Sequence, residues 1–158
     1  MSAGGEIQAV TFGVDGEVFA VPVTLVREIL DYKAPFHVPN GPDHFLGLTE
    51  VRGQGVPTVD FRLRLGLPRA EPTLATRILI LDVPLADRML TLGVVIDRVL
   101  SVSAYETARI EAAPDIGVRW RSDYITGVVR QEGGFVVIVD IARIFTSEDV
   151  GLLSAKVA

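Results

Sequence analysis

The sequence predicts a mainly β protein made of two similar small units, and two observations support this. First, one segment occurs twice at an offset of 80 residues. Residues 47–65 and 127–145 both run through a glycine, a loop, an apolar strand, an aspartate and a short amphipathic turn. A weaker match at an offset of 73 relates 19–26 to 92–99. Second, the apolar runs are short and rich in β-branched residues, which suit pleated strands.

Length and composition restrict the possible classes of protein. A half of roughly 70 residues buries too little surface to be securely stable alone, so we expect the two halves to share one core. The chain has no cysteine, which excludes disulfides and thiolate sites. Its net charge of −5 argues against binding to nucleic-acid phosphates. No run approaches the ~20 apolar residues of a membrane span, and the first residues lack the pattern of a signal peptide.

The first half contains recognisable strand, turn and cap signals. Asp15-Gly16 between apolar-rich runs predicts a hairpin of strands 7–14 and 17–21. Pro22 suits a first helical turn, and the apolar residues that follow it predict a short helix over 23–30. A second hairpin is expected over 45–51 and 56–59, with its tip at Arg52-Gly53-Gln54-Gly55. Asp60 is expected to cap a helical turn over 61–65.

The second half is predicted to repeat this plan after a polar linker over 69–76. Its elements are expected to be strands 78–83 and 89–96, a loop 112–123 that contains Trp120, a hairpin of 124–130 and 135–139, and a turn 141–145 capped by Asp140. We expect a single domain over 1–158. Its approximate subdomains are a first barrel over 7–68, a second barrel over 77–146 and a C-terminal helix over 147–158.

The sequence offers little for catalysis, so we predict no catalytic residue, metal or cofactor. His37 and His44 lie beside apolar residues in one loop, which is more typical of packing than of ligation. Asp60 and Asp140 are related by the repeat and could form a carboxylate pair. We interpret them instead as two equivalent helix caps, which accept bonds from backbone N–H groups. Metalloprotease and serine-hydrolase motifs are absent.

One difference between the repeats draws attention to Glu28 and Arg52. At the two offsets these residues correspond to Ser101 and Glu132, so only the first half carries the pair. If the predicted helix that carries Glu28 packs on the hairpin tip, the two side chains could form a bidentate ion pair. An exposed pair of this kind contributes only about 0–1 kcal/mol to stability. A functional role is therefore as plausible as a structural one.

A family pattern surrounds these two residues. It consists of Phe12-Gly13, Val26-Arg27-Glu28-Ile29, Phe45-Leu46-Gly47, Val51-Arg52-Gly53, Val56 to Arg62, Gly93 to Asp97, Tyr124 to Gly127 and Asp140-Ile141. With these motifs the chain, from about residue 7 to residue 153, resembles the CheW-type chemotaxis coupling proteins. The resemblance implies two tandem, five-stranded SH3-like β-barrels that share a core, with a few short helices including a C-terminal one.

The resemblance also implies a function. Members of this family are not enzymes. They are cytoplasmic adaptors recruited to membrane-associated chemoreceptor arrays, where they bridge two partners. One partner is the regulatory domain of a CheA-type histidine kinase, and the other is the helical hairpin at the cytoplasmic tip of a methyl-accepting chemoreceptor. The expected partner-binding residues, matched by position, are Val26, Glu28, Gly47, Arg52, Gly93, Val99, Val102 and Gly127.

The family implies a particular use for each of these positions. Val26 would contact a partner through an exposed apolar side chain, and Val99 and Val102 would line a groove. Gly47 and Gly93 would let strands approach closely there. The chain departs from the family at Glu50, where asparagine is common. Glu50 could compete with Glu28 for Arg52, or could select a particular receptor.

Three alternatives stay open from the sequence. The same fold could serve a chemotaxis-like pathway that controls pili, development or gene expression. A hydrolase would need a carboxylate pair within about 5–9.5 Å, or a serine within reach of His37 or His44. A small-barrel nucleic-acid-binding protein would need a basic face and steep salt dependence of binding.

Overall fold

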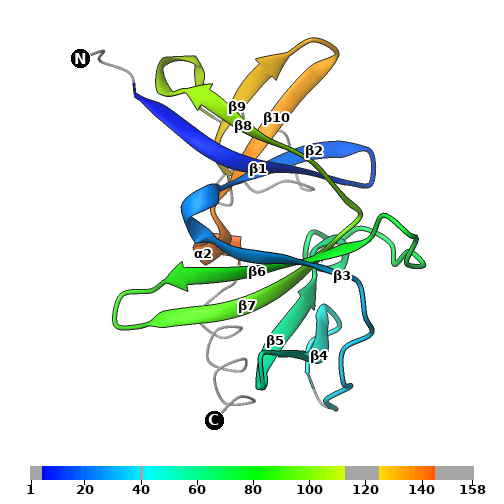
Figure 1. Ribbon diagram of the computed structural model, residues 1–158. Coiled ribbons are helices and arrows are strands. Elements are labelled where there is room, and N and C mark those ends of the chain that lie inside the picture. Colours follow the sequence, from blue (N-terminus) through cyan, green and yellow to red (C-terminus); the bar gives the residue numbers. More distant parts are fainter. Residues whose placement is uncertain (1–4, 40, 113–124, 145–158) are drawn as a thin grey trace.

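The computed structural model describes residues 5–39, 41–112 and 125–144, which form two five-stranded sheets seen as two lobes in Figure 1. The first sheet has the order β8-β1-β2-β10-β9, with bounds Arg98–Glu106, Glu6–Val14, Glu17–Pro22, Gly134–Val139 and Ile125–Gln131. The second has the order β3-β6-β7-β5-β4, with bounds Val26–Asp31, Arg77–Pro84, Met89–Ile96, Gln54–Asp60 and Phe45–Val51. The predicted mainly β architecture of two five-stranded units is confirmed.

The two sheets do not coincide with the two halves of the chain. The first sheet joins β1 and β2 to β8, β9 and β10, and the second joins β3, β4 and β5 to β6 and β7. Parallel pairing of β10 with β2 and of β5 with β7 connects the two contributions. The predicted ranges 7–68 and 77–146 therefore do not separate the sheets, because each half exchanges its last three strands with the other. The predicted loop around Trp120 and the helix over 147–158 lie outside the described residues.

Local turn and cap signals placed most elements correctly. The tight turn at Asp15 and Gly16 has φ angles of 54° and 79°, and the turn at Arg52 and Gly53 has 51° and 85°. Positive φ at both central residues is the geometry that suits two-residue hairpins. The second tip is therefore Arg52-Gly53 alone, since β5 already begins at Gln54.

The helix predicted over 23–30 is wrong. Residues Val23–Leu25 form a single 3-10 turn, η1, and Val26–Asp31 form strand β3. Apolar residues at positions 23, 26 and 30 fit a helical period, but tertiary pairing outweighs that signal. The backbone from Val26 onward pairs with β6 of the other half, and the sequence near residue 30 carries no sign of this partner.

Two short helices follow the repeated hairpins, as predicted. Helix α1 spans Phe61–Arg64, and the Asp60 carboxylate accepts a hydrogen bond from Leu63 N at 3.4 Å. Helix α2 spans Ile141–Ile144, and Asp140 accepts one from Arg143 N at 3.3 Å. Both aspartates therefore cap their helices. Burial raises the pKa of Asp60, against the lowering effect of its backbone hydrogen bonds.

Three apolar clusters fill the described part of the molecule. One lies inside the first sheet and one inside the second, around Ile138 and Ile80 respectively. The largest, which we call the shared core, draws residues from both sheets. At its centre the rings of Phe12, Phe19 and Phe61 lie 5.3 to 5.8 Å apart between centroids. The expectation that the halves share a core is confirmed.

Candidate partner-binding site

Glu28 and Arg52, the pair singled out by the repeat comparison, form an ion pair. Arg52 Nε donates to Glu28 Oε2 at 3.2 Å, and Arg52 Nη2 donates to Glu28 Oε1 at 3.4 Å. The guanidinium approaches from the β4–β5 turn, while the carboxylate stands on β3. The Arg52 side chain is 80% exposed and that of Glu28 is 21% exposed. The pair thus presents its cation to solvent while Glu28 holds it in a bidentate geometry.

This ion pair spans the two edges of the second sheet, since β3 and β4 are its first and last strands. The chain beyond β3 also reaches β4 by backbone pairing. Phe36 N donates to Leu48 O at 2.8 Å, and Leu48 N donates to Phe36 O at 2.9 Å. The first sheet closes in the same way at the repeat-related position, through Glu111 and Val128 at 2.8 and 2.9 Å. These contacts close each sheet on itself.

Gly47 and Gly127 occupy equivalent positions beside these closures. Gly47 has a φ of 136°, and a Cβ there would overlap the carbonyl oxygen of Phe36. A Cβ on Gly127 would overlap the side chain of Ile110 and lie 2.9 Å from the carbonyl oxygen of Glu111. Both glycines therefore permit the close approach that closes the barrels, which is a structural reason for a residue type expected from the family pattern.

Gly93 serves a different packing contact. It lies in β7 opposite Thr58, and a Cβ on it would lie 2.7 Å from Thr58 Oγ1. Thr58 is fully buried, and its hydroxyl bonds Thr49 Oγ1 at 2.6 Å and the carbonyl of Val56 at 3.0 Å. The missing side chain at Gly93 therefore makes room for a satisfied buried hydroxyl pair, within the second sheet.

The predicted apolar positions Val26 and Val99 occupy equivalent places in the two sheets. Val26 on β3 is paired with Leu81, and Val99 on β8 is paired with Phe12. Directly paired residues share one face of a sheet, and both of these partners belong to the shared core. Val26 and Val99 are half-buried against that core, so Val26 is less exposed than the family pattern implies.

A bulge in each strand brings a second apolar residue onto the same face. Arg27 is the extra residue in β3 and Leu100 is the extra residue in β8. As a result Ile29 pairs with Leu79 of the shared core, three positions after Val26. Without the bulge, residues three apart would point to opposite faces.

Val102 is placed in the same way, opposite Val10 of the shared core and three positions after Val99. Ile29 is 39% exposed and Val102 is 60% exposed, so each strand has an open apolar side chain three positions after a half-buried one. The bulge residue Leu100 is a further exposed apolar side chain on β8, at 43%. Sequence reasoning missed Ile29. The offset of 73 relates Val99 to Val26 and Val102 to Ile29, so the repeat itself held the signal.

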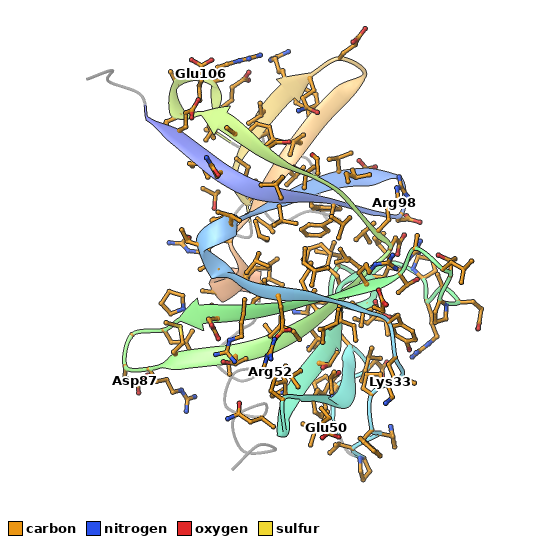
Figure 2. The ribbon with its side chains drawn as sticks, viewed as in Figure 1. Lys33, Glu50, Arg52, Asp87, Arg98 and Glu106 are labelled. Atoms are coloured by element: carbon orange, nitrogen blue, oxygen red, sulfur yellow. The ribbon has the colours of Figure 1, made fainter. Side chains whose placement is uncertain are left out.

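Glu50 does not take the place of Glu28 beside Arg52. The Arg52 guanidinium bonds Glu28, whereas Glu50 is exposed on β4 opposite Gly55. Figure 2 shows both labelled side chains on the lobe formed by the second sheet. Glu50 therefore adds a solvent-facing negative charge to the same hairpin that presents Arg52.

Several of the side chains that a hydrolase would need make structural hydrogen bonds. Ser101 and Ser103 bond each other through their hydroxyls at 2.8 Å, and Asp60 and Asp140 each cap a separate helix. Among the described residues, no group of three or more His, Asp or Glu side chains could hold a metal ion. Over the same residues, no helix has both the length and the apolar character to cross a membrane.

Comparison with known proteins agrees with this architecture. The CheW-like domain matches residues 8–149. The chain is 30% identical over 145 residues to chemotaxis protein CheW of Rhizobium meliloti, covering 92% of this chain and 91% of the relative. It is 33% identical over 140 residues to chemotaxis protein CheW of Bacillus subtilis, covering 88% and 86%.

A solved structure shares the fold. The crystal structure of the scaffolding protein TtCheW from Thermoanaerobacter tengcongensis superposes with a TM-score of 0.80 at 19% identity, covering 92% of this chain and 91% of that one. This similarity confirms the predicted fold class of tandem SH3-like barrels. From the domain match and the two relatives, the chain belongs to the CheW-like domain family.

Proposed function

We propose that this protein is a non-enzymatic adaptor that couples the cytoplasmic tips of chemoreceptors to a CheA-type histidine kinase. The observation that carries the proposal is the combination of Glu28 and Arg52 with the open apolar positions Ile29 and Val102. An ion pair at a barrel seam that leaves its cation 80% exposed adds little to stability but gives a partner a fixed charge.

The apolar positions suit a helical partner. Val26 and Ile29 on β3, and Val99 and Val102 on β8, lie on the faces of the two sheets that carry the shared core. An amphipathic helix binds such a surface through apolar residues spaced along one side. The helical hairpin of a receptor tip has this form, and Glu28 lies between Val26 and Ile29 in sequence.

The adaptor role needs a second surface for the kinase. A protein that binds both partners raises their effective concentration for each other without any chemistry of its own. The relatives described above are named chemotaxis proteins, and TtCheW is named a scaffolding protein. These names support a chemotaxis adaptor, which acts in the cytoplasm at receptor arrays in this proposal.

The proposal is tested by co-sedimentation of receptor-containing membranes with the CheA-type kinase of the same organism, with and without this protein. We expect kinase in the pellet only when the adaptor is present. A Glu111→Lys variant should still recruit the kinase, because it breaks only the Glu111–Arg130 pair at the corresponding seam of the first sheet. It is the matched control for variants of Glu28 and Arg52. If wild-type protein recruits no kinase, or if it recruits kinase without receptor, the coupling function is wrong.

A further inference from the structure

We propose that Arg62 is a positioning residue that holds the two barrels in one relative orientation. It would thereby set the spacing between the apolar positions on β3 and those on β8. The link to coupling rests on the function proposed above. The clamp itself is a property of the fold, and it can be measured without any partner.

Arg62 extends from α1 and uses its whole guanidinium. Its Nε donates to Asp97 Oδ1 at 3.0 Å and its Nη2 donates to Asp97 Oδ2 at 2.8 Å. Its Nη1 donates to Asp15 Oδ1 at 3.3 Å and to the carbonyl of Pro68 at 3.2 Å. The Arg62 side chain is only 16% exposed, so solvent screens these contacts less than it screens the pair at Arg52.

Arg62 and its two charged partners come from different parts of the fold. Asp15 lies in the β1–β2 turn of the first sheet, and Arg62 follows β5 of the second sheet. Asp97 is the single residue between the end of β7 and the start of β8, where the chain crosses from the second sheet to the first. The guanidinium, which stands on the helix after the last strand of the first half, therefore ties the β1–β2 turn of the first sheet to the crossing between the two sheets.

Backbone bonds make Asp97 the centre of this clamp. Its Oδ2 also accepts from Asp15 N at 2.8 Å, and its own N–H donates to the carbonyl of Gly13 at 3.2 Å. Burial alone would raise the pKa of Asp97. The hydrogen bonds from Arg62 and Asp15 and the nearby positive charges outweigh burial, and the pKa is lowered. Asp97 therefore stays ionised, and keeps its pair with Arg62, at neutral pH.

The repeat shows that this clamp belongs to one crossing only. At the offsets of 73 and 80, the positions of Asp97, Asp15 and Arg62 correspond to Thr24, Arg88 and Ala142. The other crossing, from β2 to β3, runs instead through the 3-10 turn η1. A feature present in one half and missing from the other is not required by the barrel fold as such.

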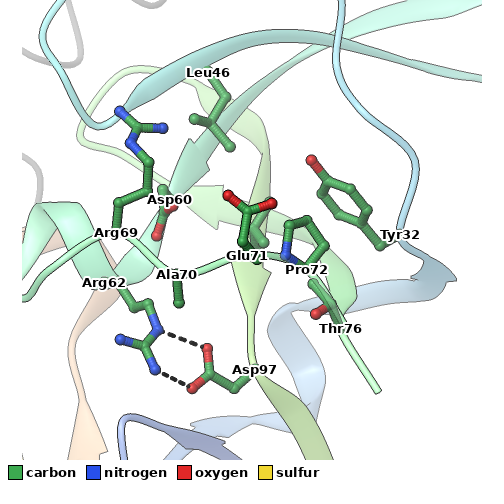
Figure 3. A pocket seen from close by; sticks show the side chains of 11 residues that line it. Tyr32, Leu46, Asp60, Arg62, Arg69, Ala70, Glu71, Pro72, Thr76 and Asp97 are labelled. Atoms are coloured by element: carbon green, nitrogen blue, oxygen red, sulfur yellow. Dashed lines mark hydrogen bonds and ion pairs between the residues drawn. The ribbon is translucent and has the colours of Figure 1, made fainter. Parts of the chain in front are cut away.

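The clamp borders a small open pocket of about 180 Å³, shown in Figure 3. The pocket lies beneath the linker after α1, and its wall includes Arg62, Asp97, Asp60, Arg69 and Glu71. Its charges are mixed in sign, so it does not single out an anion or a cation as ligand. The pocket leaves free volume beside the clamp, which would allow the crossing to shift if Arg62 released Asp97.

Such a shift would reach the candidate site directly. Val99 is two residues beyond Asp97 and Val102 is five residues beyond it on the same strand. The corresponding residues Val26 and Ile29 stand on β3 of the other sheet. A change in the angle between the sheets would therefore alter the spacing of the two apolar pairs.

The clamp is tested by measuring the distance between the barrels in the free protein. Because the chain has no cysteine, Asp87→Cys and Glu132→Cys place one spin label on an exposed turn of each sheet. Pulsed electron double resonance should give a narrow distribution of label-to-label distances when Arg62 is unchanged. Arg62→Ala should broaden or shift it, and Arg62→Lys should restore part of the narrow peak.

The matched control is Arg27→Ala. Arg27 also forms a bidentate pair with an aspartate, through Nε to Asp82 Oδ2 at 3.0 Å and Nη2 to Asp82 Oδ1 at 2.9 Å. That pair joins β3 to β6 within one sheet, so its loss should leave the distribution unchanged. If a folded Arg62→Ala variant keeps the wild-type distribution, or if Arg27→Ala broadens it equally, the clamp is wrong. Should Arg62→Ala not fold, Arg62→Gln against Arg27→Gln decides the question by the same criteria.

The link between the clamp and coupling is tested by kinase recruitment. We expect a several-fold loss for Arg62→Ala with a broadened distribution, and little loss for Glu111→Lys, whose ion pair with Arg130 involves no residue of the two apolar pairs. A broadened distribution with full recruitment would overturn the positioning role while leaving the adaptor function intact. Wild-type protein that recruits no kinase would overturn the adaptor function, whereas the distance measurement would still decide whether the clamp exists.

Discussion

Glu28 and Arg52 meet across the seam of the second barrel, where the carboxylate on β3 receives two hydrogen bonds from the guanidinium in the β4–β5 turn. The two residues are 24 positions apart: Glu28 belongs to β3 at one edge of the sheet, and Arg52 to the turn next to β4 at the other edge. Their contact depends on closure of the barrel. Within β3, Glu28 pairs with Ile80 of the second sheet's own cluster, whereas Val26 and Ile29 pair with residues of the shared core. The charge and the apolar side chains of the candidate site therefore lie on the two faces of one edge strand.

Replacing Glu28 by lysine should abolish coupling and leave the fold intact. An exposed pair contributes about 0–1 kcal/mol, so the thermal transition should move little. Coupling should fail because Arg52 would face a like charge and the partner would meet a reversed charge on β3. The measurement is kinase activation in receptor membranes, beside a thermal melt. Glu111→Lys, which breaks the corresponding pair of the first barrel, should retain activation. Normal activation by Glu28→Lys would remove this residue from the site.

Exchanging the charges of Glu28 and Arg52 tests whether the partner depends on the ion pair or on each side chain separately. Arg52→Glu alone should impair coupling to a similar extent as Glu28→Lys. The double variant Glu28→Arg with Arg52→Glu should recover part of the activity if the partner depends on the geometry that the ion pair holds. Kinase activation of the two single variants and the double variant gives the coupling free energy of a double-mutant cycle. A double variant no better than the worse single one would mean that the partner contacts each charge separately.

Gly47→Ala should destabilise the protein far more than Gly66→Ala does. Both glycines have positive φ, at 136° and 82°, so alanine strains the backbone at each by about 1–3 kcal/mol. Only at Gly47 would the added methyl overlap the Phe36 carbonyl, whereas no atom lies within 4 Å at Gly66. The overlap should add about 1–3 kcal/mol and open the seam. Urea unfolding of both variants makes the comparison. Equal losses would show that backbone strain alone explains both positions.

Asp60 should respond differently to alanine and to asparagine. Loss of the helix cap in Asp60→Ala should cost about 0.5–2 kcal/mol, whereas asparagine keeps an acceptor. Burial raises the pKa of Asp60 in the folded protein, so the fold favours the protonated form. The contribution of Asp60 to the stability of the wild type therefore falls as pH rises from below the unfolded pKa, about 3.9, through the folded one.

Asparagine cannot ionise, so the stability of Asp60→Asn relative to the wild type should increase over that pH range. Chemical unfolding of both proteins at several pH values between about 3 and 7 measures the difference. A difference that is constant with pH would contradict the raised pKa. An Asp60→Ala variant with unchanged stability would contradict the cap.

Local signals in the sequence were sufficient for much of the fold. The turns at Asp15-Gly16 and Arg52-Gly53 and the caps at Asp60 and Asp140 depend on residues within a few positions of one another. The equivalence of the two halves was visible from the repeated segment alone. The pairing of Glu28 with Arg52 was also predictable. It followed from the difference between the repeats rather than from any distance along the chain.

The sequence by itself determined most of the strands, the turns and the caps, because backbone preferences and apolar alternation act over a few residues. Only the tertiary structure decided which strands pair, and so it alone turned residues 26–31 from a predicted helix into β3. It also placed the bulges at Arg27 and Leu100, and joined Arg62 to Asp97 across 35 positions. These features depend on contacts between segments that are distant in the sequence. Such contacts form only when both barrels close around their shared core, so short-range sequence patterns do not predict them.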